Sequence, residues 1–123
     1  MNVTKWLFGL LVLSTTVQAE GLTGTYSSLF YHEEAGDLLG IEILILPAAT
    51  TGSDFKYNAV VQIAEGGAPD VFVIPLKELD SASFVLELPS GTKLIAKREL
   101  EGLTITWPHG DVDELKKGQS YWR

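Results

Sequence analysis

The chain has 123 residues, with nine Lys and Arg against sixteen Asp and Glu, two His and no Cys. This length suits one compact domain, and the lack of Cys excludes disulfides, thiolate metal sites and a cysteine nucleophile. A formal net charge of −7 argues against nucleic acid as a partner, because its phosphates attract basic surfaces.

Residues 1–19 are typical of a secretory signal peptide. Lys5 supplies the positive charge, residues 6–13 form an unbroken apolar run, and a polar stretch ends in the small residue Ala19. The run is short for a membrane-spanning helix, which needs about 20 residues; a permanent N-terminal anchor is the alternative. We therefore expect export to the periplasm or the medium, with a membrane-free mature domain of residues 20–123 and a net charge of −8.

The mature chain is predicted to be all-β, because short apolar runs alternate with turn residues about every 8–12 residues. The clearest strand spans residues 55–64, where Lys56, Asn58 and Gln62 share one face and apolar side chains at alternate positions share the other. In chain order, the expected strands span residues 24–31, 38–46, 55–64, 71–76, 83–88, 92–100 and 103–107.

Three further segments carry other signals. Residues 77–82 are polar and are compatible with one helical turn. Residues 111–118 begin with acids and end with bases and Gly118, an order that the helix dipole favours, so we expect one short C-terminal helix there. Residues 120–122 are expected to form a last strand or an aromatic plug.

Short loops favour pairing between strands that follow one another in the sequence. This predicts an up-and-down meander of about eight strands that closes into a barrel, since closure removes exposed strand edges. A two-sheet β-sandwich of the same strands is the alternative.

Three short motifs resemble known proteins. Gly-Thr-Tyr at residues 24–26 resembles the Gly-x-Trp/Tyr opening of calycin barrels, the group of lipocalins and avidins. This opening, Glu-Ala-Gly-Asp at residues 34–37 and the ending Leu-x-x-Gly-x-Ser-Tyr-Trp at residues 115–122 are together similar to small exported bacterial proteins of unknown function. The likeness covers nearly the whole mature chain. It implies a calycin-like barrel and supplies no activity.

The best polar cluster for catalysis is His32, Glu33, Glu34 and Asp37, because two carboxylates can serve as general acid and base. These side chains fall in a hairpin turn, where water solvates them. No nucleophile elbow, phosphate loop or dinucleotide fingerprint is present. We therefore expect a protein that is not an enzyme.

Two arrangements raise the question of a metal. Asp111, Asp113 and Glu114 offer oxygen ligands to calcium but lack the spacing and the Gly of a calcium loop. His32 and His109 would bind zinc only if the fold brought them together with carboxylates. We expect no metal and no cofactor.

The aromatic side chains favour a binding role. Most of them are expected to fill the core, but Tyr and Trp also suit the rim of an apolar pocket at a barrel mouth. The candidate ligand-binding residues are Tyr26, Tyr57, Trp107 and Tyr121. They would hold a small apolar ligand in or at the mouth of the barrel.

The acidity of the chain favours a second role, although acidity also serves solubility alone. Complementary charge speeds the encounter with a cationic protein, and an exported acidic protein could block a basic secreted enzyme such as a lysozyme. His32, Glu33, Glu34 and Asp37 would then form the partner-binding loop. Both roles are hypotheses at this point.

Overall fold

A computed structural model of the chain describes residues 21–48 and 55–122. The expected signal peptide lies outside the described residues, as does most of the loop that follows Pro47. The described residues form strands and no α-helix. The strands are β1 (Gly24–Ser27), β2 (Phe30–His32), β3 (Asp37–Pro47), β4 (Tyr57–Glu65), β5 (Asp70–Glu78), β6 (Ser83–Glu87), β7 (Lys93–Arg98), β8 (Gly102–Thr106) and β9 (Val112–Lys117).

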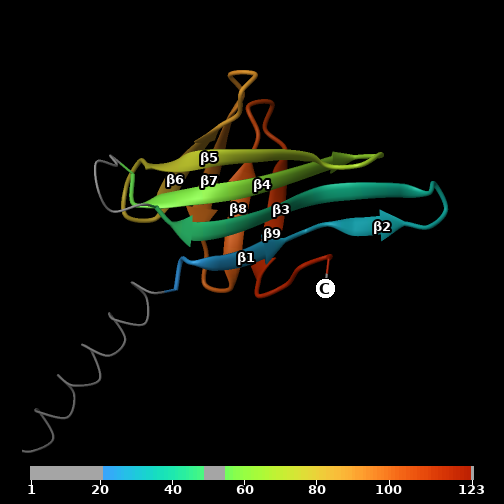
Figure 1. The fold of residues 1–123 in the computed structure, drawn as a ribbon, viewed down its shortest axis with the longest axis horizontal. Coiled ribbons are helices and arrows are strands. Elements are labelled where there is room, and N and C mark those ends of the chain that lie inside the picture. Colours follow the sequence, from blue (N-terminus) through green and yellow to red (C-terminus); the bar gives the residue numbers. More distant parts are fainter. Residues whose placement is uncertain (1–20, 49–54, 123) are drawn as a thin grey trace, which may run out of the picture.

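Eight of these strands form a closed antiparallel barrel (Figure 1). Each strand from β3 to β9 pairs with the next in the sequence, and β1 completes the circle by pairing with both β9 and β3. In Figure 1, β3, β4 and β5 run across the picture, and β6 to β9 cross behind them at a steep angle. The predicted all-β meander barrel is confirmed, and its closure excludes the two-sheet sandwich.

The first expected strand, residues 24–31, is interrupted. Its two parts, β1 and β2, pair with successive stretches of β3. At the break, Ser28 donates its backbone N–H to the Ile41 carbonyl oxygen at 2.8 Å, and its Oγ accepts the Ile41 N–H at 3.1 Å. Gly40 lies beside this break with φ of +113°, and a Cβ there would lie 2.5 Å from the Ser28 carbonyl oxygen. Only glycine fits this close approach.

The predicted helix at residues 111–118 is wrong, because this segment forms β9. Leu115 is buried opposite Leu103 of β8, and Lys116 and Lys117 pair with β1. An isolated helix of this length is marginal in water, whereas β9 satisfies backbone groups of two neighbouring strands. The requirement to close the barrel therefore overrides the local charge pattern.

Two smaller expectations also fail. Residues 77–82 form no helical turn: β5 continues to Glu78, and the Asp80 carboxylate then accepts the backbone N–H groups of Ala82 and Ser83, both at 2.8 Å. Such side-chain bonding to the backbone stabilises a tight turn instead. Tyr121 and Trp122 form neither a strand nor a plug, and both are exposed.

The barrel interior is filled by side chains, as expected for eight strands. Every barrel strand contributes to one buried cluster, so the core is continuous from end to end. The cluster comprises Leu22, Tyr26, Ile41, Ile43, Ile45, Ala59, Val61, Ile63, Ile74, Leu76, Phe84, Leu86, Leu88, Leu94, Ala96, Leu103, Ile105 and Leu115.

Candidate functional site

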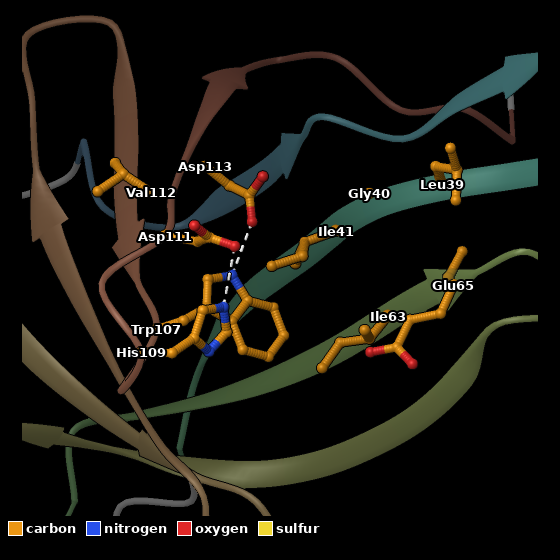
Figure 2. Close-up of a pocket in the computed structure, with 11 residues that line it drawn as sticks. Leu39, Gly40, Ile41, Ile63, Glu65, Trp107, His109, Asp111, Val112 and Asp113 are labelled. Atoms are coloured by element: carbon orange, nitrogen blue, oxygen red, sulfur yellow. Dashed lines mark hydrogen bonds and ion pairs between the residues drawn. The ribbon is translucent and has the colours of Figure 1, made fainter.

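An open hollow of about 570 Å³ lies at one end of the barrel (Figure 2). We call this the mouth end; because successive strands run antiparallel, it carries the β2–β3, β4–β5, β6–β7 and β8–β9 turns. The hollow is bounded by the start of β3, the end of β4 and the β8–β9 turn. It is lined by Leu39, Gly40, Ile41, Ile63, Ala64, Glu65, Trp107, His109, Asp111, Val112 and Asp113.

The hollow lies where the barrel wall is incomplete. β1 pairs with β9 only through Tyr26 with Lys117 and Ser27 with Lys116. After Ser27, the break at Ser28 takes the chain away from β9. Among the described residues, no strand therefore pairs with the first half of β9 along the edge that β1 occupies further on. The start of β3 and the start of β9 therefore form two separate walls.

The base of the hollow is apolar. Ile41 and Ile63 both belong to the buried core cluster, and half-buried Trp107 packs against that cluster. These three side chains come from β3, from β4 and from the end of β8. The hollow is thus an outward continuation of the core, where apolar groups from distant parts of the sequence meet (Figure 2).

Hydrogen bonds fix the aromatic wall. The Trp107 Nε1 donates to Oδ2 of Asp113 at 2.7 Å, and His109 Nε2 lies 3.0 Å from Oδ2 of Asp111 (Figure 2). The imidazole and indole rings are 6.0 Å apart, centre to centre. Within the turn, Trp107 donates its N–H to the Asp111 carbonyl and accepts that of Gly110. The turn therefore holds Trp107 in one orientation at the edge of the core.

The rim of the hollow is acidic. Glu65 stands on the β4 wall, and Asp111 and Asp113 stand on the opposite wall. No Lys or Arg lines the hollow, and within the described residues the three carboxylates form no salt bridge apart from the contact of Asp111 with His109. A negative field therefore faces the hollow from both sides.

The structure does not bring the four predicted ligand-binding residues together. Trp107 lines the hollow, but Tyr57 is the first residue of β4, whereas the hollow is lined by the last residues of that strand. Tyr121 lies outside the barrel. Tyr26 is only 2 % exposed, and its hydroxyl donates to the Leu22 carbonyl at 2.6 Å. Burial raises the pKa of Tyr26 above its ordinary value of 10.0, partly opposed by the charge of Arg98.

The predicted partner-binding loop forms the β2–β3 turn. His32, Glu33 and Glu34 are exposed, and the His32 Nδ1 accepts the backbone N–H of Ala35 at 3.2 Å. Asp37 closes the turn, and its carboxyl carbon lies 3.7 Å from where a Cβ on Gly66 would stand. Asp37 therefore lies close to the β4–β5 turn, but no residue of the loop lines the hollow.

Sequence reasoning did not assign the remaining lining residues to a ligand site, although it considered His109, Asp111 and Asp113 as metal ligands. Asp111 and Asp113 are part of the predicted helix, which concealed their place beside Trp107. The available signal was the closeness of Trp107, His109, Asp111 and Asp113 in the sequence, around the turn residues Pro108 and Gly110. Trp107 and Ile63 meet in the hollow although they lie far apart in the sequence. No local sequence pattern could have predicted this proximity.

A second polar site, also missed, fixes the C-terminal segment to the outside of the barrel. Glu42 points outward from β3 yet is only 3 % exposed. Its carboxylate accepts the Ser120 hydroxyl at 2.9 Å and the Tyr121 N–H at 2.7 Å. The Trp122 Nε1 donates to Oε1 of Gln62 on β4 at 2.8 Å. We call residues 119–122 the C-terminal latch.

No protein-family model, curated protein or solved structure matches this chain. The resemblance to calycins and to small exported bacterial proteins therefore stays a prediction. Within residues 21–48 and 55–122, no three His, Cys, Asp or Glu side chains are grouped closely enough to hold a metal ion. The same residues include no helix long and apolar enough to cross a membrane.

Proposed function

We propose that this protein is a noncatalytic binding protein that holds a small, largely apolar ligand at the mouth of its barrel. The observation that supports this most directly is the hollow of about 570 Å³ with Ile41, Ile63 and Trp107 at its base. Sites of roughly 300–1,000 Å³ that combine apolar walls with a few polar groups are typical of small-ligand binding.

The filled interior supports a ligand position outside the core. The core cluster takes side chains from all eight barrel strands, so the ligand rests on the core at the mouth. Trp107 contributes most to such contact, because an indole has the largest apolar surface of any side chain in the hollow.

Native mass spectrometry of the protein purified from its own export compartment tests this proposal, together with titration by the neutral apolar dye N-phenyl-1-naphthylamine. We expect a retained ligand mass or a saturable rise in dye fluorescence. Trp107→Ala should weaken dye binding about tenfold or more, while Trp122→Phe, on the outer surface, should leave it unchanged. Absence of both signals, or equal effects of the two substitutions, would contradict the proposal.

A second candidate function is docking to a cationic protein. Three of the four turns of the mouth end contain no Lys or Arg: residues 30–39, 63–72 and 105–113. The fourth, between β6 and β7, is followed by Lys93. The carboxylates of the first three turns give them a negative surface that would steer a basic partner. These carboxylates are Glu33, Glu34, Asp37, Glu65, Asp70, Asp111 and Asp113.

Titration with a basic secreted enzyme such as a lysozyme, at low and at physiological salt, tests this second function. The double substitution Glu33→Gln and Glu34→Gln should weaken binding several-fold. The control Glu99→Gln and Glu101→Gln changes the charge equally in the β7–β8 turn, at the opposite end of the barrel. Equal loss in both variants would show that only net charge matters and would refute docking at the mouth end.

A further inference from the structure

We infer that the ligand of the hollow is an organic cation, in which an ammonium or guanidinium group is joined to an apolar body. This inference rests on the proposed function and names its ligand class. It combines the apolar base of the hollow, the fixed indole and the charge of the rim, which are three separate features of one site.

The charges of the rim lie on opposite walls of the hollow. Glu65 faces Asp111 and Asp113 across the hollow, and no Lys or Arg lines it. Asp113 uses Oδ2 to hold the indole and Asp111 uses Oδ2 to contact His109, while their second oxygens accept no hydrogen bond from a described residue. An anionic ligand would meet uncompensated repulsion here, whereas a cation would gain acceptors on both walls.

The indole of Trp107 lies beside one of these charges. Trp107 is held by its Nε1 bond to Asp113, so the orientation of its ring is set before any ligand arrives. A cation within about 6 Å of an indole face is attracted by the ring quadrupole. Asp113 fixes the ring and also carries a negative charge beside it. The cationic group of a ligand could therefore contact the indole face and the Asp113 carboxylate at the same time.

The shape of the hollow suits an organic ligand better than a bare metal ion. The described His, Asp and Glu side chains form no group of three within metal-binding reach. The carboxylates stand on separate walls, with Ile41 and Ile63 between them. A ligand that fills this space therefore needs an apolar part as well as its charge.

Three probes that share one ring but differ in charge test the inference: 2-(1-naphthyl)ethylamine, 2-(1-naphthyl)ethanol and 1-naphthylacetate. Binding is measured by calorimetry at pH 7 and physiological salt. We expect the amine to bind at least tenfold more tightly than the alcohol, and the acetate to bind most weakly. Asp111→Asn with Asp113→Asn should reduce the preference for the amine to about twofold, because the amide oxygen introduced at position 113 can still accept the indole N–H.

Two further variants separate site from bulk charge. Glu65→Gln alone should reduce the amine preference several-fold without touching the turn that holds Trp107, so it remains informative if the double variant unfolds. Glu99→Gln with Glu101→Gln should leave the preference intact.

The outcomes distinguish the inference from the proposed function. If the amine and the alcohol bind equally, and Trp107→Ala abolishes the binding of both, the cation inference is wrong. The proposal of small-ligand binding would then still be supported. The amine preference surviving all mouth substitutions would also overturn the cation inference. Failure of all three probes and of the neutral dye would overturn both proposals. A lysine-rich peptide is titrated in parallel; if it binds while the free amine does not, the small-molecule form of the inference is wrong and docking of a cationic protein is favoured.

Discussion

The C-terminal latch allows the contribution of a single hydrogen bond to stability to be measured. A nearly buried carboxylate there accepts hydrogen bonds from two neutral donors. Glu42 is 3 % exposed and accepts hydrogen bonds from the Ser120 hydroxyl and the Tyr121 N–H. Hydrogen bonds to charged groups contribute about 1.5–3 kcal/mol each, and a buried acceptor that loses its donor costs a similar amount. We therefore expect Ser120→Ala to lower the free energy of unfolding by about 1.5–3 kcal/mol.

The same substitution should matter less once the charge is gone. In Glu42→Gln, the amide oxygen can accept the Tyr121 N–H, and the amide nitrogen can donate to Ser120. A neutral pair contributes about 0.5–1.5 kcal/mol, so Ser120→Ala in this background should cost about 1 kcal/mol less than in the wild type. Trp122 remains bonded to Gln62 throughout, which keeps the latch in place when Ser120 changes.

Urea unfolding of the four proteins in this double-mutant cycle measures the difference directly. Ser90→Ala is the matched control: its hydroxyl bonds to Thr92 in an exposed turn, so its cost should be small and equal in both backgrounds. If Ser120→Ala and Glu42→Gln add to within about 0.3 kcal/mol, the charge of Glu42 does not strengthen its hydrogen bond with Ser120.

The remaining predictions concern the core and two turns. Gly102→Ala should lower stability by more than about 2 kcal/mol in thermal unfolding, because its Cβ would overlap the Leu115 carbonyl oxygen; Gly67→Ala, with open space around it, should change stability by less than about 0.5 kcal/mol. Burial raises the pKa of Tyr26, so the unfolded chain loses this proton first and stability should fall as the pH rises above about 10; Tyr26→Phe should flatten that fall in urea midpoints. NMR titration should place the carboxyl pKa of Asp80 below its ordinary value of 3.8, because backbone N–H groups in its turn donate to it. The contribution of that turn should be lost as the pH falls through the lowered pKa.

The barrel could be predicted from the sequence because its signal is local. Alternation of polar and apolar residues over 55–64 marks a strand with one buried face, and turn residues such as Gly36 separate successive strands. The break between β1 and β2 could not be predicted, because it depends on Ser28 reaching Ile41 and on the space left by Gly40. Ser28 and Ile41 are 13 positions apart in the sequence, beyond the reach of a local pattern.

The site could be predicted only in part, for the same reason. Trp107 was identified by its chemical type alone. Its partner Asp113 was assigned to a helix, since acids followed by bases are a local helix signal. Glu42 shows the converse case: a single acid within an apolar strand is typical of a solvent-facing residue, and only the folding of Ser120 over it reveals a buried acceptor.

The proposed site and the closure of the barrel depend on the same segment. β9 joins β8 to β1, but its ladder with β1 has only two residue pairs, and its first half lies beside the hollow. A ligand that contacts Trp107 and Ile63 at once would bridge the β8–β9 turn to β4 across this gap. Binding to the folded state alone raises the unfolding free energy by RT ln(1 + [L]/Kd). Amide hydrogen exchange should therefore slow most in residues 112–115 when the amine probe is added, and uniform slowing over all strands would argue against this bridging contact.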